Sequence, residues 1–114
     1  MASQFFVDLY GCDDSVINDL EKIKMIAHDA IESIGADIVE ECFHEFAPQG
    51  ITYIAVISTS HFSVHTWPEH GYAAVDIFSC DEKVPGMVAE RLQEAFGAKK
   101  SKVREFERDI EGRE

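Results

Sequence analysis

The chain has 114 residues, 22 of them acidic and 10 basic, which gives a formal net charge of −12, and 46% of its residues are hydrophobic. This length and hydrophobic content predict a single domain with a core of moderate size and exclude wholesale disorder. The acidic excess repels phosphate backbones, which excludes nucleic acid as a partner, and no apolar run approaches the roughly 20 residues that a membrane span requires.

Residues 1–4 lack the basic start and apolar stretch of a signal peptide, so we expect a cytoplasmic protein. Residues 5–10 are aromatic and β-branched, which predicts a strand. Residues 13–15 supply helix N-cap side chains, and apolar residues then recur every three or four positions as far as residue 34, which predicts one helix. Residues 37–46 predict the next strand.

The remainder of the chain is predicted to be mostly strand. A turn is expected at the Pro-Gln-Gly of residues 48–50. A second helix is expected over residues 84–96, where apolar residues again follow helical spacing. Alternating or apolar stretches predict four further strands, at residues 52–58, 61–66, 72–80 and 101–107.

This order of elements predicts an α+β fold, a two-layer α/β sandwich in which a mainly antiparallel sheet carries two helices on one face. Residues 1–114 form one domain in this interpretation, because no linker or low-complexity tract interrupts them. The second face of the sheet must also be covered, and a partner subunit is the simplest cover for so short a chain.

Residues 58–72 combine serines, three histidines and a Trp-Pro-Glu step in one short stretch. A stretch that only filled a core would be apolar, and a simple loop would not alternate like a strand. We therefore expect chemistry in this segment.

Ser60 is a candidate for chemistry on its own backbone. Its hydroxyl can attack the carbonyl of Thr59 and convert the amide to an ester, which then leaves by elimination after a base removes the serine Cα proton. Hydrolysis of the resulting dehydroalanine leaves a pyruvoyl group at the new N-terminus. His65 is the candidate base, and Thr52 offers a hydroxyl to the oxyanion.

A pyruvoyl carbonyl can bind a substrate amine and serve as an electron sink for decarboxylation. Cys80 could then supply the proton that replaces the lost carboxylate. The spacing of the three cysteines, Cys12, Cys42 and Cys80, matches no zinc or thioredoxin motif, and in a cytoplasmic protein they should be reduced.

Four segments resemble the short prokaryotic form of the S-adenosylmethionine decarboxylase proenzyme family. They cover nearly the whole chain in order, and the string His-Thr-Trp-Pro-Glu-x-Gly-Tyr at residues 65–72 is highly specific. The four matching segments are residues 8–13, 43–50, 60–74 and 76–80.

The resemblance implies decarboxylation of S-adenosylmethionine to the aminopropyl donor for spermidine synthesis. It implies cleavage between Thr59 and Ser60 into a β chain of residues 1–59 and an α chain of residues 60–114, with the pyruvoyl group derived from Ser60. It also implies a homodimer of cleaved αβ units with sites near the subunit interface. The roles of Thr52 and His65 in processing and of Cys80 as proton donor match the same family pattern.

The resemblance also implies a substrate pocket. Phe46 matches a residue that packs on the adenine, and Glu69 matches a carboxylate that accepts the ribose hydroxyls. Trp67 is interpreted as pocket wall or as core.

One departure from the family pattern keeps alternatives open. Thr59 stands where the family has glutamate, which is compatible with a simpler substrate, ornithine or arginine, or with an unprocessed, non-catalytic or regulatory homologue. We expect no metal. The alternative is a metal site built from a set of side chains in and near the central segment: His61, His65, Glu69, His70 and Cys80.

Overall fold

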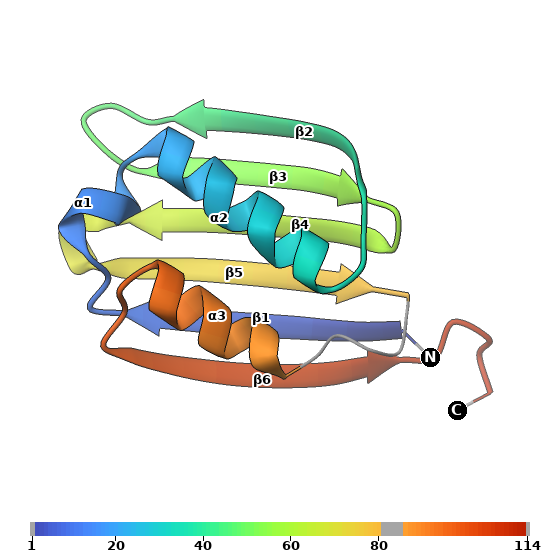
Figure 1. The fold of residues 1–114 in the computed structure, drawn as a ribbon. Coiled ribbons are helices and arrows are strands. Elements are labelled where there is room, and N and C mark those ends of the chain that lie inside the picture. The colour runs from blue at the N-terminus through green and yellow to red at the C-terminus, as the bar shows by residue number, and fades with distance from the viewer. Residues whose placement is uncertain (1, 81–85, 114) are drawn as a thin grey trace.

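The computed structural model describes residues 2–80 and 86–113. One six-stranded sheet has the order β2-β3-β4-β5-β1-β6, and every neighbouring pair of strands is antiparallel (Figure 1). The predicted α+β class is confirmed. In chain order the elements are β1 (Ala2–Tyr10), α1 (Asp14–Ile17), α2 (Leu20–Ser33), β2 (Ile38–Glu45), β3 (Ile51–Ile57), β4 (Ser60–Trp67), the 3-10 helix η1 (Pro68–His70), β5 (Tyr72–Ser79), α3 (Met87–Ala95) and β6 (Lys100–Arg108).

The α-helices lie on one face of the sheet (Figure 1), and there are three of them in the described residues instead of the two predicted. The first predicted helix is divided because the Asp19 side chain accepts a hydrogen bond of 3.1 Å from the N–H of Lys22 and starts α2 afresh. The predicted start of the last helix at Val84 lies outside the described residues. None of the described helices is long and apolar enough to cross a membrane.

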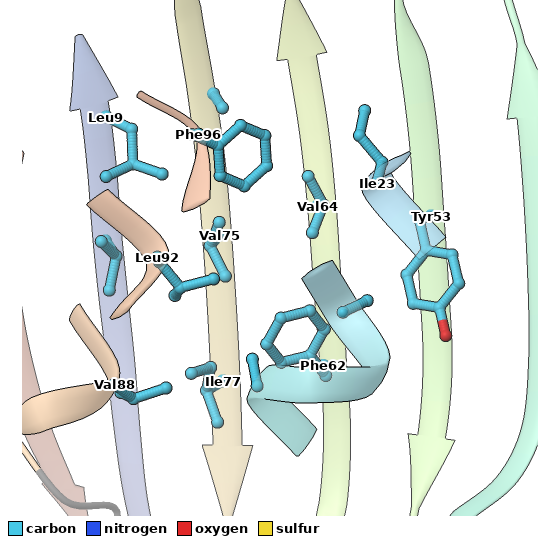
Figure 2. Packing of buried hydrophobic residues seen from close by; sticks show 14 of the residues in the cluster. Leu9, Ile23, Tyr53, Phe62, Val64, Val75, Ile77, Val88, Leu92 and Phe96 are labelled. Atoms are coloured by element: carbon cyan, nitrogen blue, oxygen red, sulfur yellow. The ribbon is translucent and has the colours of Figure 1, made fainter. Parts of the chain in front are cut away.

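The hydrophobic core lies between the helices and the sheet (Figure 2). Alternate residues of the central strands point into it, and each large side chain buried there contributes about 1.5–3 kcal/mol of transfer free energy. The labelled core side chains are Leu9, Tyr53, Phe62, Val64, Val75 and Ile77 from the sheet, and Ile23, Val88, Leu92 and Phe96 from the helices and the C-terminal end of α3.

The alternation that buries one set of residues presents the other set on the opposite face of the sheet, which no described helix covers (Figure 1). We call this the open face. Apolar side chains remain exposed there, with Ile54 at 39%, Val56 at 49% and Phe106 at 57% exposure. These exposed apolar side chains, on a face that no described helix covers, are compatible with an interaction surface.

Candidate active site

The predicted site residues gather at opposite ends of β4. Ser60 begins this strand beside the β3–β4 turn, and Trp67 ends it beside the β2–β3 loop (Figure 1). Ser60 and His65 are five positions apart, and a strand rises by about 3.3 Å per residue, so they lie about 16 Å apart along β4. His65 therefore does not reach the Thr59–Ser60 peptide of its own chain.

The first end holds the predicted cleavage point. Ser60 has a φ of 145° and is the one non-glycine residue with a positive φ in the described part of the chain. Only glycine adopts such a φ readily, and a residue with a Cβ held there carries about 1–3 kcal/mol of strain. The peptide that the predicted reaction would break is therefore strained in the intact chain.

The carbonyl of Thr59 is held by its surroundings. Its oxygen accepts a hydrogen bond of 2.7 Å from the main-chain N–H of Cys80, which follows β5. An N–H in this position polarises the carbonyl and would stabilise the negative oxygen that forms when a nucleophile adds to its carbon. The Thr59 hydroxyl is buried and has no hydrogen-bond partner among the described residues.

The second end holds the predicted processing pair. Thr52 and His65 are direct partners across β3 and β4, and Thr52 Oγ1 lies 3.0 Å from His65 Nδ1. This hydrogen bond fixes the orientation of the imidazole and directs Nε2 away from Thr52. A histidine held in this way can act as a general base toward a group that approaches the open face.

A pocket of about 390 Å³ lies beside this pair, which is within the usual size range of small-molecule sites. It brings together an aromatic ring, an indole and a carboxylate, namely Phe46, Trp67 and Glu69, which are the three predicted substrate-binding residues. Its remaining lining residues are Gln49, Gly50, Ile51, Thr52, His65 and Thr66.

The β2–β3 loop shapes one side of the pocket. The N–H of Phe46 donates to the carbonyl of Gly50 at 2.8 Å, and the N–H of Gly50 donates to Asn18 Oδ1 at 3.0 Å. Gly50 has a φ of 107°, and a Cβ there would lie 3.4 Å from the carbonyl oxygen of Thr66, so glycine suits this position. Sequence reasoning missed Asn18, because it joins this loop only through the tertiary structure.

A partly buried carboxyl group on the open face was also missed. Asp76 pairs with Ser63 across β4 and β5, and its burial raises its pKa above the ordinary value of 3.8, although the nearby His65 and His61 oppose the shift. The available signal was the single charged residue Asp76 within an otherwise apolar strand.

The alternative metal site does not assemble in the described residues. His61 and His65 share one face of β4, as their spacing suggested, whereas His70 lies in η1 and Cys80 follows β5. No three His, Cys, Asp or Glu side chains come together as a possible metal site within residues 2–80 and 86–113.

The fold and this site define the chain as a small α+β protein with a strained serine beside a hydrogen-bonded carbonyl. Within this class, the chain belongs to the S-adenosylmethionine decarboxylase family, whose model matches residues 3–109. The resemblance seen in the sequence motifs is confirmed at this level.

Curated relatives named S-adenosylmethionine decarboxylase proenzyme support the assignment. The relative from Pelotomaculum thermopropionicum is 46% identical over 104 residues, which are 90% of this chain and 82% of that one. The relative from Moorella thermoacetica is 45% identical over 90% of this chain and 83% of its own. The crystal structure of the adenosylmethionine decarboxylase from Aquifex aeolicus VF5 superimposes with a TM-score of 0.82 and 29% identity, covering 100% of this chain and 95% of that chain.

Proposed function

We propose that this chain is a proenzyme that cuts itself between Thr59 and Ser60 and then decarboxylates S-adenosylmethionine, which yields the aminopropyl donor for spermidine synthesis. Family membership supports the substrate and the reaction. The observation that carries the proposal is the strained Ser60 beside a Thr59 carbonyl that already accepts a hydrogen bond from Cys80 N–H.

The self-processing reaction balances with groups of the chain and water. Ser60 Oγ adds to the carbonyl carbon of Thr59, and the oxyanion is held by Cys80 N–H. The C–N bond then breaks, the nitrogen of Ser60 takes a proton, and an ester joins the two residues. A base removes the Cα proton of Ser60, and the ester leaves as the carboxylate of Thr59. Addition of water and loss of ammonia convert the dehydroalanine to a pyruvoyl group.

The residues around position 60 fit such a group, because its precursor serine is strained and its neighbouring carbonyl has a main-chain donor. A pyruvoyl group supplies a ketone that binds the substrate amine and draws electrons as carbon dioxide leaves. Cys80 donates a proton to the substrate carbon. Phe46 packs on the adenine, Glu69 accepts the ribose hydroxyls, and Trp67 forms a wall beside them.

A homodimer completes the site in this proposal. One chain holds Ser60 and the pocket about 16 Å apart, and its open face exposes apolar side chains such as Val56 and Phe106. Two copies stacked by their open faces would lie about 10 Å apart. A two-fold axis between them, perpendicular to the strands and near Ser63, exchanges the ends of β4. The end of β4 that begins at Ser60 in one protomer then lies over the partner's His65.

A cytoplasmic location is part of the proposal, because Cys80 can donate a proton only as a free thiol, and the cytoplasm keeps thiols reduced. The second candidate function, decarboxylation of ornithine or arginine, keeps the same chemistry at Ser60. Thr59 is the residue that motivates it, since it departs from the family glutamate.

Intact mass and a substrate panel test the proposal on the purified full-length chain. We expect two polypeptides, residues 1–59 and 60–114, the second carrying a pyruvoyl group, and release of carbon dioxide from S-adenosylmethionine. Release from ornithine, arginine or lysine instead would favour the second candidate. A single unbroken chain with serine at position 60 would refute both.

A further inference from the structure

The indole of Trp67 belongs to a column of three aromatic rings on the open face. The Tyr72 ring lies between the other two, with its centroid 5.3 Å from that of Trp67 and 5.4 Å from that of Tyr10. Trp67 and Tyr72 are also the last residue pair of β4 and β5. Ring pairs at these separations attract one another beyond their area of burial, so Tyr72 is the central support of the column.

Tyr72 is fixed at its outer end as well. Its hydroxyl donates a hydrogen bond of 2.5 Å to Asp8 Oδ1 on β1. Burial, reinforced by this hydrogen bond to Asp8, raises the pKa of Tyr72, so the phenol keeps its proton over the physiological range. A bond from a neutral hydroxyl to a carboxylate is among the stronger hydrogen bonds in proteins.

Trp67 needs such support because it separates two hollows. On one side is the pocket with Phe46 and Glu69, and a second hollow of about 440 Å³ is lined by Tyr10, Trp67, His70 and Tyr72. The indole is 43% exposed, so packing leaves it room to turn. Of the described ring contacts of Trp67, Tyr72 is nearer than His65, whose centroid lies 6.4 Å away.

We propose that Tyr72, anchored by Asp8, is a positioning residue that holds the Trp67 indole as the wall of the nucleoside pocket. This inference rests on the proposed binding of S-adenosylmethionine in that pocket. Tyr72 itself does not line the pocket, so its influence on the substrate passes through the tryptophan.

Tyr72→Phe and Asp8→Asn test the role, and both keep the side-chain size. Tyr72→Phe removes the anchoring hydrogen bond, and Asp8→Asn replaces its carboxylate acceptor by a weaker, neutral amide. Trp67 is the only tryptophan of the chain, so its fluorescence reports the wall directly. In both variants we expect complete cleavage, altered tryptophan emission without ligand, a KM for S-adenosylmethionine raised about tenfold and a kcat within about twofold of the unmodified enzyme. A rise in KM alone is the signature of lost ground-state positioning.

Tyr53→Phe is the matched control. Tyr53 is buried on the helix-covered face, and its hydroxyl donates to Glu41 Oε1 at 3.1 Å. Its loss should lower the melting temperature and leave KM and tryptophan emission unchanged.

An unchanged KM and unchanged emission in Tyr72→Phe and Asp8→Asn would overturn the inference. A lowered melting temperature as the only effect of these variants would also overturn it, and so would a loss of cleavage. Failure of the proposed function would give a different experimental result. In that case the unmodified protein would not bind S-adenosylmethionine at all, whereas the emission change on loss of the Asp8 anchor would still be measurable.

Discussion

The main-chain N–H of Cys80 lies 2.7 Å from the carbonyl oxygen of Thr59 and donates a hydrogen bond to it. This bond ties the end of β5 to the β3–β4 turn. Since the donor belongs to the backbone, no ordinary change of the Cys80 side chain removes it. The same residue can therefore assist cleavage through its backbone and turnover through its thiol, and the two functions can be separated by mutation.

Cys80→Ala should cleave like the unmodified chain and lose about 100-fold or more in decarboxylation, because the donor N–H stays and the proton donor is lost. Intact mass and carbon dioxide release measure the two effects. Cys42→Ala, at an exposed position of β2, is the control and should change neither. Normal turnover by Cys80→Ala would show that the proton comes from another group.

Ser60→Ala and Ser60→Gly should both stay uncut, because both lack the hydroxyl, yet they should differ in stability. At a φ of 145° alanine keeps the strain and glycine relieves it, so the glycine variant should be about 1 kcal/mol more stable to unfolding. Urea unfolding of the two uncut proteins measures the difference. Greater stability of the alanine variant, the usual order for these two residues, would show that position 60 is unstrained.

Co-expression of Ser60→Ala and His65→Ala chains tests the shared site. Each variant alone should remain uncut. In mixed dimers, Ser60 of the His65→Ala chain meets the partner's His65, so we expect cleavage of that chain, and the resulting fragment of residues 60–114 carries the mass of alanine at position 65.

The control for this experiment replaces the Ser60→Ala chain by the double variant Ser60→Ala/His65→Ala. No dimer then holds both groups, and no fragment should form. Fragments in the control, or none in the first mixture, would argue against a site built from two chains.

Glu69→Gln should cleave normally and raise the KM for S-adenosylmethionine about tenfold or more, because a neutral amide is a weaker acceptor for the ribose hydroxyls than a carboxylate. Steady-state kinetics on the cleaved protein gives the value. Glu90→Gln, at an exposed position of α3, should leave KM unchanged. Equal affinity in the Glu69 variant would favour the amino-acid substrates.

Asp76→Asn should stabilise the chain at neutral pH. The folded-state pKa of Asp76 is raised mainly by burial, so the stability it contributes is full below its ordinary pKa of 3.8 and is lost as pH rises through the raised value. The asparagine variant avoids this loss, so its higher free energy of unfolding relative to the parent chain should disappear in acid. Protonation of the nearby His65 and His61 favours the charged carboxylate, and Asp8 opposes it.

Urea unfolding in the Ser60→Ala background at pH 7 and near pH 4 measures the difference for one uncut chain. Glu107→Gln, at an exposed position of β6, is the control, and its effect on the free energy of unfolding should differ little between the two pH values. A destabilised Asp76→Asn at pH 7 would mean that the carboxylate is stabilised by its surroundings, contrary to the effect of its burial.

Much of the fold could be predicted because its signals are local. The apolar stretches of β5 and β3 predicted both strands to within a residue or two of their ends. The break between α1 and α2 could not be seen in the apolar pattern, because Ile17, Leu20 and Ile23 keep helical spacing across it. The irregularity in β2 between Ile38 and Glu40, which places Ile38 and Cys42 on opposite faces, gave no signal either.

The sequence predicted which residues line the candidate pocket, but only partly how the candidate site residues lie relative to one another. Phe46, Trp67 and Glu69 do line one pocket. The closeness in sequence of Ser60 and His65 suggested closeness in space, but an extended strand separates residues that are near in sequence. The φ of Ser60 and the bond from Cys80 to Thr59 depend on the register of three strands, which no local pattern encodes.

The proposed cleavage would relieve the unusual backbone angle at Ser60 and would be irreversible. Once the bond before this residue is cut, nothing forces the two new ends back into the unfavourable geometry, and the departing ammonia removes the nitrogen that would be needed to rejoin them. Each molecule therefore records whether it has passed this point. In a growing culture, the ratio of intact to cleaved polypeptide should therefore fall as the average age of the enzyme molecules rises.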